Sequence, residues 1–206
     1  MIVIIDYGVG NLGSIKNMLK KAGGESVISS DVRVISEAGK LILPGVGSFD
    51  TGMTNILNLG ILDILKRKVM VEKIPLLGIC LGMQLLSNRS EEGMVEGLGF
   101  INGETVKLDF PESKKRMFKI PHMGWNYVEL QKPSRLFSGM YPNPRFYFVH
   151  SYSLKVFSDK DILTTTDYGM KITSSVEKDN IIGVQFHPEK SHKFGMKLLK
   201  NFIDLY

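Results

Sequence analysis

One segment of the sequence places a reactive side chain between glycines at a sharp change of direction. Gly78-Ile79-Cys80-Leu81-Gly82 follows an apolar run and precedes a helical pattern, as in a nucleophile elbow, where a strand turns into a helix. The glycines suit a strained apex, and a helix N-terminus favours the thiolate of Cys80. The backbone N–H of Leu81 would point to the same place and stabilise an oxyanion. A lone cysteine is more often a buried apolar residue, so a partner is needed.

A cysteine nucleophile needs a base, and the base needs an orienting group. His187 lies in the segment Gly183–Glu189, at the end of a predicted buried strand. Residues two apart in an extended backbone face the same side, so His187 and Glu189 would share one face, with Pro188 keeping His187 extended. The carboxylate would hold one imidazole nitrogen and leave the other facing Cys80. The other histidines are expected on the surface (His192) and in unusual loops (His122, His150).

Short apolar runs alternate with helical patterns in the first half of the chain. The predicted buried strands are Ile2–Ile5, Lys40–Leu43 and Pro75–Ile79, and the predicted helices are 12–22, 55–68 and 83–86. This β-α-β-α order favours an α/β fold with a mostly parallel central sheet and helices on both faces. It places the Cys80 turn where the third of these strands runs into a helix.

The second half is richer in strands, several of which alternate in polarity. We expect strands at 106–108, 126–130, 145–149, 162–166, 172–176 and 181–185, and a last helix at 193–205. These patterns predict mixed strands in that half. We find no repeat, linker or composition break, so residues 1–206 are expected to form a single domain.

Composition excludes several classes of function. The net charge of +5 would suit an anionic partner, but the basic residues are scattered, with small clusters at 66–68 and 114–116 that are expected on a solvated surface. No nucleic-acid-binding signature appears. The apolar stretch 74–86 is too short to span a bilayer. One cysteine and four dispersed histidines form no metal-ligand spacing, and Gly8-Val9-Gly10 lacks the third glycine of a dinucleotide motif, so no cofactor is expected.

The location of the protein is expected to be cytoplasmic. A single cysteine excludes an internal disulfide. A reducing compartment is therefore the simplest assumption. The chain starts directly with the apolar run Met1–Ile5, without a basic leader or a small-residue cleavage site. Export is therefore not expected.

Several motifs together resemble a known family. Gly78–Gln84 and Gln185–Glu189 are similar to the class I (triad) glutamine amidotransferases. Motifs from near the first residue to near the last resemble the glutaminase subunits of imidazole glycerol phosphate synthase, namely Asp6–Asn11, Leu43–Phe49, Pro121–Asn126, Tyr147–Tyr152 and His187–Ser191.

The resemblance implies a reaction and the residues for it. A cysteine attacks the side-chain amide of glutamine, ammonia leaves, and water hydrolyses the glutamyl thioester to glutamate. It implies Cys80 as nucleophile, His187 as general acid and base, and Glu189 as its orienter. It further implies an oxyanion site (Gly45, Val46, Gly47, Leu81) and a glutamine site (Gln84, His150, Ser151, Tyr152), with Glu91 or Glu92 near the α-ammonium group.

The resemblance also implies a partner. In that family the glutaminase forms a heterodimer with a (β/α)₈-barrel synthase subunit, which uses the ammonia to make imidazole glycerol phosphate and an aminoimidazole carboxamide ribotide in histidine biosynthesis. The positions that would face the partner are Asn11, Met123, Trp125, Asn126 and Lys190. A lone tryptophan in a loop fits an interface as well as a core cap.

Free ammonia released without an acceptor wastes glutamine, so the isolated chain is expected to be nearly idle. The loop Gly45-Val46-Gly47 is the natural switch, because its glycines permit a peptide flip and β-branched Val46 makes the flipped state costly.

Three alternatives stay open. The ammonia could serve a sugar amidotransferase of surface-polysaccharide synthesis, since the basic segment 108–119 and Phe100, where tryptophan is expected, leave the partner undetermined. A thiol hydrolase such as a γ-glutamyl peptidase would share the elbow and a histidine, but would not need the segment Pro121–Asn126. A non-enzymatic binding module would leave Cys80, His187 and Glu189 without a common purpose.

Overall fold

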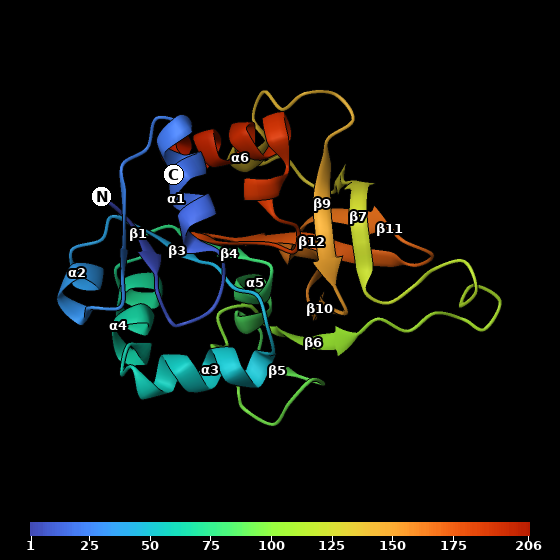
Figure 1. The fold of residues 1–206 in the computed structure, drawn as a ribbon, viewed down its shortest axis with the longest axis horizontal. Coiled ribbons are helices and arrows are strands. Elements are labelled where there is room, and N and C mark those ends of the chain that lie inside the picture. The colour runs from blue at the N-terminus through green and yellow to red at the C-terminus, as the bar shows by residue number, and fades with distance from the viewer.

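A mixed eight-stranded sheet lies at the centre of the molecule, between two layers of helices (Figure 1). The computed structural model describes all residues, 1–206. The strand order is β2-β1-β3-β4-β13-β12-β11-β8. The parallel strands are β1 (Ile2–Ile5), β2 (Ser26–Ser29), β3 (Lys40–Leu43), β4 (Leu76–Ile79) and β13 (Ile181–Val184). The antiparallel strands are β8 (Glu129–Leu130), β11 (Ile162–Asp167) and β12 (Lys171–Lys178). The predicted α/β fold is confirmed, with parallel strands in the centre and antiparallel ones from the second half.

Helices cover both faces of this sheet. On one face lie α1 (Leu12–Lys21) and α6 (His192–Leu205). On the other lie α2 (Val32–Ser36), α3 (Phe49–Asn58), α4 (Leu62–Lys66) and α5 (Leu81–Leu85). None of these helices is both long and apolar enough to cross a bilayer.

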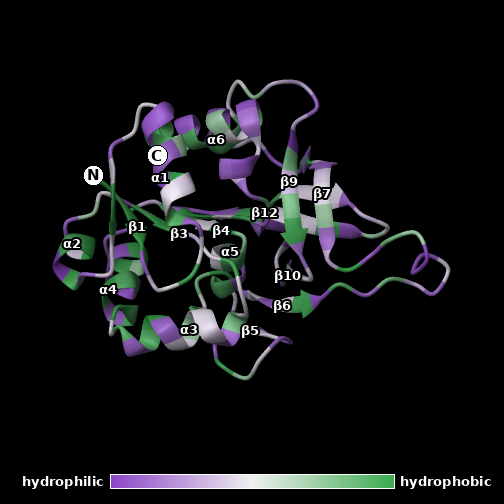
Figure 2. Cartoon of the chain, viewed as in Figure 1, coloured by the Kyte–Doolittle hydropathy of each residue, from purple (hydrophilic) through white to green (hydrophobic).

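Strands β1, β4 and β13 carry no polar side chain, as expected where both faces of a strand are covered (Figure 2). In β1, Val3 and Ile5 pack with α2 to α5, whereas Ile2 and Ile4 pack with α1 and α6. Each fully buried isoleucine contributes on the order of 2 kcal/mol. The two cores therefore hold the carboxyl end of β4, where Cys80 follows, from both sides.

The predicted helix at 55–68 is wrong in its bounds. The structure has α3 and α4 instead, followed by a π-helical turn, η1 (Arg67–Val71). Gly60 separates the helices with a φ of +66°, a conformation that favours glycine and ends a helix. The apolar positions on both sides of the break face the same core, which is why they resemble one continuous helix in the sequence.

Two small sheets extend the second half beyond the main sheet. One contains β10 (Tyr152–Val156), β6 (Gly103–Lys107) and β5 (Arg89–Ser90), and the other pairs β7 (His122–Tyr127) with β9 (Arg145–His150). Between them, residues 108–121 project away from the body of the molecule (Figure 1). Short 3₁₀ turns are η2 (Arg135–Phe137), η3 (Asp159–Asp161) and η4 (Pro188–Lys190).

The histidines expected in loops are in fact paired strand residues. His122 begins β7 and His150 ends β9, and the register of this antiparallel ladder places them opposite each other. The predicted strand 126–130 is likewise corrected: β7 starts earlier, at His122, and ends before the buried Val128. The sequence around His122 contains a proline and a glycine, which hid the strand.

Candidate active site

Cys80 occupies a strained turn between β4 and α5. It has φ +54° and ψ −109°, which is unusual for a residue with a side chain. A Cβ on Gly82 would lie 1.7 Å from the Leu43 carbonyl oxygen, and one on Gly78 would lie 2.7 Å from the Gly82 oxygen. Both glycines are therefore required for the strand and the helix to approach. The predicted elbow geometry is present, and it leaves the thiol at the edge of a cavity.

His187 and Glu189 form a buried pair next to this turn. The His187 Nδ1 atom lies 2.8 Å from Oε1 of Glu189. The contact is the predicted one, but the backbone between them is not extended, because Pro188–Lys190 form the turn η4. Only His187 itself keeps the extended conformation expected before a proline. The 3₁₀ turn brings the carboxylate back toward the ring, which an extended strand would not do as closely.

The imidazole of His187 is also close to the thiol. Burial disfavours its charged form, but the neighbouring Cys80 and Glu189 outweigh burial and raise the pKa of His187 to about 9. The Nε2 atom makes no hydrogen bond in this resting arrangement. It is thus free to exchange a proton with the thiol or with a bound substrate.

A cavity of about 320 Å³ opens beside Cys80, which is a suitable size for an amino-acid substrate. It brings together predicted residues from three separate segments. They are Val46, Gly47, Cys80, Leu81, Gln84, His150, Ser151 and Tyr152, with Glu92, Pro121 and Val149 completing the lining. Of the two acidic candidates, only Glu92 lines this cavity, and its Oε2 accepts a 2.8 Å hydrogen bond from the Phe49 N–H.

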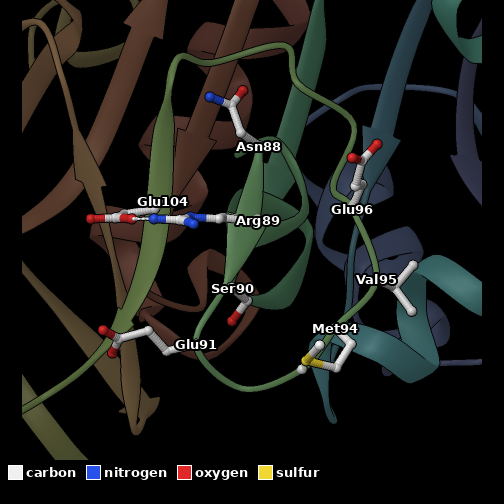
Figure 3. A pocket seen from close by; sticks show the side chains of 9 residues that line it. Asn88, Arg89, Ser90, Glu91, Met94, Val95, Glu96 and Glu104 are labelled. Carbon is white, nitrogen blue, oxygen red and sulfur yellow. Dashed lines mark hydrogen bonds and ion pairs between the residues drawn. The ribbon is translucent and has the colours of Figure 1, made fainter.

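Glu91 belongs to a different hollow, of about 540 Å³, formed by the segment 88–96 and Glu104 (Figure 3). There Arg89 and Glu104 form an ion pair at 2.9 Å. Glu91 accepts a hydrogen bond from the Lys107 N–H at 2.8 Å, which holds it at β6. This hollow contains none of the residues Cys80, His187 and Glu189.

The expected oxyanion donor is already engaged. The Leu81 N–H donates to the Gly45 carbonyl oxygen at 3.3 Å. Tyr7, which was not predicted from the sequence, donates its hydroxyl to the Pro44 carbonyl, and burial raises its pKa above the ordinary value, so it stays protonated. A Cβ on Gly45 would lie 2.4 Å from that hydroxyl. The loop after β3 is therefore held at its first residues and exposed at Val46 and Gly47.

The residues expected to face a partner lie on exposed or half-buried positions. Met123 and Trp125 on β7 are 60% and 42% exposed, so Trp125 does not cap the core. Trp125 stacks on His192, which is exposed as expected. Lys190 is exposed over the Tyr147 ring, and Asn11 caps α1 by accepting from the Ser14 N–H.

No group of three or more His, Cys, Asp or Glu side chains is arranged to hold a metal ion. The polar groups beside the Cys80 thiol are instead an imidazole held by a carboxylate and a main-chain N–H, that of Leu81, which already donates to Gly45. This arrangement suits acyl transfer through a covalent thioester.

Comparisons with known proteins point the same way. A family model described as Glutamine amidotransferase class-I matches residues 3–205. A protein of Methanococcus maripaludis, named imidazole glycerol phosphate synthase subunit HisH 2, is 63% identical over 203 residues and covers 98% of each chain. A Pseudomonas aeruginosa protein with the same name is 49% identical over 205 residues and covers 100% of both.

Two solved structures share the fold. A glutamine amidotransferase from Thermotoga maritima aligns with a TM-score of 0.66 at 16% identity, covering 100% of this chain and 81% of that one. PurLQS from Thermotoga maritima aligns with a TM-score of 0.72 at 18% identity, covering 98% and 97%. At such identities the likeness concerns the fold alone.

Proposed function

Because the chain belongs to the class-I glutamine amidotransferase family, we propose that it is the glutaminase subunit of an imidazole glycerol phosphate synthase. Relatives of that name match it from end to end, which agrees with the motifs found in the sequence. The observation that carries the chemistry is the His187–Glu189 contact of 2.8 Å beside a thiol on a strained turn.

The proposed reaction converts glutamine and water into glutamate and ammonia. The Cys80 thiolate attacks the side-chain carbonyl carbon, and His187 gives a proton to the nitrogen as the carbon–nitrogen bond breaks. A water molecule then attacks the thioester, His187 takes its proton, and the thiolate leaves. Glu189 holds the imidazole at Nδ1, so that Nε2 faces the reacting atoms throughout.

Gln84 would recognise the substrate through its oxygen. Both hydrogens of its amide nitrogen are used inside the protein, at 3.0 Å from the Tyr152 carbonyl and 3.1 Å from Oε1 of Gln185. Its Oε1 is left as an acceptor, which suits an α-ammonium group. Glu92, on the same cavity, would add a negative charge there. His150 would contribute through its backbone, since both its ring nitrogens are engaged.

The resting structure supports the expected low activity of the isolated chain. The Leu81 N–H donates to Gly45, so it cannot stabilise an oxyanion. A flip of the peptide between Gly45 and Val46 would remove that carbonyl and aim the Val46 N–H at the cavity. Two donors would then face the oxyanion. Binding of the synthase subunit is the proposed trigger.

The partner would be a (β/α)₈-barrel synthase subunit that forms a heterodimer with this chain and consumes the ammonia in histidine biosynthesis. Exposed Met123 and Trp125, with Asn126, Asn11 and Lys190, form the proposed contact face. The relatives do not favour the sugar amidotransferase alternative. The cytoplasmic location stays a prediction.

The test is a glutaminase assay on the chain alone and with the barrel synthase subunit of the same organism. Glutamate formation should be slow alone, should rise in the complex with acceptor present, and should be absent with Cys80→Ala. Equal rates with and without the synthase subunit would contradict the proposed switch. Capture of an adenylating sugar amidotransferase from the native cell, in place of a barrel subunit, would contradict the proposed partner.

A further inference from the structure

Gln185 is a fully buried polar residue that the proposed reaction does not use. It follows β13 and is 0% exposed. Its backbone N–H donates to the Ser174 carbonyl at 2.9 Å, which holds it at the edge of β12. Its side-chain nitrogen lies 3.7 Å from the Cys80 sulfur. At this distance the effect on the sulfur depends on whether the nitrogen or the oxygen of the buried amide faces it.

The orientation of this amide follows from its neighbours. Nε2 of Gln84 lies near both the Tyr152 carbonyl, at 3.0 Å, and one end of the Gln185 amide, at 3.1 Å. A main-chain carbonyl only accepts, so the Gln84 atom there must be the nitrogen. That nitrogen is a donor, so the Gln185 atom facing it must be the oxygen. The NH₂ group of Gln185 is thereby left to face Cys80.

The same reasoning extends outward through two histidines. Nδ1 of His150 lies 2.8 Å from the Tyr152 carbonyl, so it carries the proton. In the neutral ring Nε2 then accepts, at 3.0 Å, from Nδ1 of His122. Nε2 of His122 in turn faces the side-chain nitrogen of Asn126 at 3.4 Å.

Burial supports the neutral state of both rings. Burial lowers the pKa of His122 to about 3, with a further contribution from His150. Burial likewise lowers the pKa of His150 to about 4, and His187 adds to it while the Tyr152 hydrogen bond opposes it. His122 is also held between the rings of Phe148 and Tyr168. Both neutral rings therefore donate through Nδ1, and the Tyr152 carbonyl accepts from His150 on one side and from Gln84 on the other.

We propose that Gln185 is a positioning residue for the nucleophile: its side-chain N–H donates to the Cys80 sulfur, stabilises the thiolate and keeps it turned toward the cavity. The proposal rests on the proposed function only in taking Cys80 as the nucleophile. Gln84 and the Tyr152 carbonyl determine that a donor, and not the amide oxygen, meets the sulfur. The oxygen in that place would repel the thiolate.

The test uses alkylation of the full chain by iodoacetamide as a function of pH, without glutamine or a partner. Cys80 is the only cysteine, so the rate reports on this thiol alone. Gln185→Leu removes the donor and should move the alkylation midpoint up by about one pH unit, a tenfold lower rate at a given pH below the midpoint. Gln185→Glu has nearly the same shape but places an oxygen near the sulfur. It should therefore raise the alkylation midpoint further than Gln185→Leu does.

The matched control is Gln131→Leu, which removes an amide bound to Thr165 at the far edge of the sheet and should leave the midpoint unchanged. A merely structural role for Gln185 would lower thermal stability without moving the midpoint. Unchanged midpoints in folded Gln185 variants would overturn the proposal, and the glutamate variant decides if the leucine variant does not fold. A parallel glutaminase assay on the wild-type complex tests the proposed function separately, because alkylation requires no turnover.

Discussion

Two glycine-bearing turns face the same cavity, and they differ in freedom. In the turn 78–82, added Cβ atoms on Gly78 and Gly82 would strike main-chain atoms at 2.7 Å and 1.7 Å. In the loop 44–48, a Cβ on Gly47 would meet nothing within 4 Å, and Val46 is exposed. The nucleophile is thus held by close packing, whereas the oxyanion loop is held only at its start, at Gly45, and is open at Val46 and Gly47. The rigid half of the site is the turn 78–82 with the proposed nucleophile. The movable half is the exposed part of the oxyanion loop, Val46 and Gly47.

Replacing the nucleophile gives the largest expected effect and tests the rigid half. Cys80→Gly and Cys80→Ala should both lower glutamine hydrolysis by about 10⁴-fold or more, since the covalent route is lost. Their stabilities should differ, because only glycine adopts φ +54° and ψ −109° without strain. The free energy of unfolding, measured by urea titration, should be higher for the glycine variant by about 1 to 2 kcal/mol. Equal stabilities would show that the turn is not strained.

The second prediction compares the glycines of the two turns. Gly82→Ala should lower the free energy of unfolding by about 4 kcal/mol or more, because the methyl group has no room beside the Leu43 carbonyl. Gly47→Ala should cost only about 1 to 3 kcal/mol, from its φ of +120° alone. Urea titrations of both variants measure the difference. A larger cost at Gly47 would reverse the assignment of the rigid and the free turn.

The third prediction concerns charge on the two sides of the cavity. The pKa of His187 is raised to about 9, so its stabilising contribution is full below pH 6.5 and is lost as pH rises to about 9. The pKa values of His122 and His150 are lowered to about 3 and 4, so their contribution is present above pH 6.5 and is lost as pH falls. Each histidine changes stability by about 1.4 kcal/mol per pH unit within its window.

Urea unfolding from pH 4 to pH 9 measures the free energy of unfolding on both sides of neutral pH, as an acid limb and an alkaline limb of the stability curve. His122→Phe should flatten the acid limb, and Glu189→Gln should flatten the alkaline one. His192→Gln, at an exposed position, is the control for removal of a histidine and should change neither. An acid limb that persists unchanged in His122→Phe would contradict the neutral pair.

The smallest expected effect tests the movable half. Val46→Gly should raise glutamine hydrolysis by the isolated chain by about three- to tenfold, because glycine removes the steric cost of the flipped peptide. The synthase complex should change less, since it already favours that state. Val32→Gly, at a similarly exposed valine on α2, is the control and should leave the rate of the isolated chain unaltered. A rate that does not rise in Val46→Gly would argue that the loop is not the switch.

The local features of the site were predictable because they depend on neighbours in sequence. The strand before Cys80 and the glycines around it are written as an apolar run and a Gly-x-Cys-x-Gly pattern, and the structure has both. His187 and Glu189 were expected in contact, and they are, although through a 3₁₀ turn. The roles of these residues remain predictions for the experiments above.

Features that depend on distant residues were not predictable from periodicity. The pairing of His122 with His150 requires β7 and β9 to meet across 28 residues, and Pro121 and Gly124 conceal the first of these strands. The break at Gly60 was hidden because both helices turn their apolar side to one core. Glu92 could not be preferred to Glu91 until the cavities were known.

By itself the sequence determined the α/β order of elements, the turn at Cys80 and the family, since each rests on local pattern and residue type. Only the tertiary structure decided that the Leu81 N–H donates to the Gly45 carbonyl and that the Gln185 amide nitrogen faces the Cys80 sulfur. The physical reason is that a hydrogen bond's direction depends on every donor and acceptor around it. Those partners come from strands that meet only when the chain is folded.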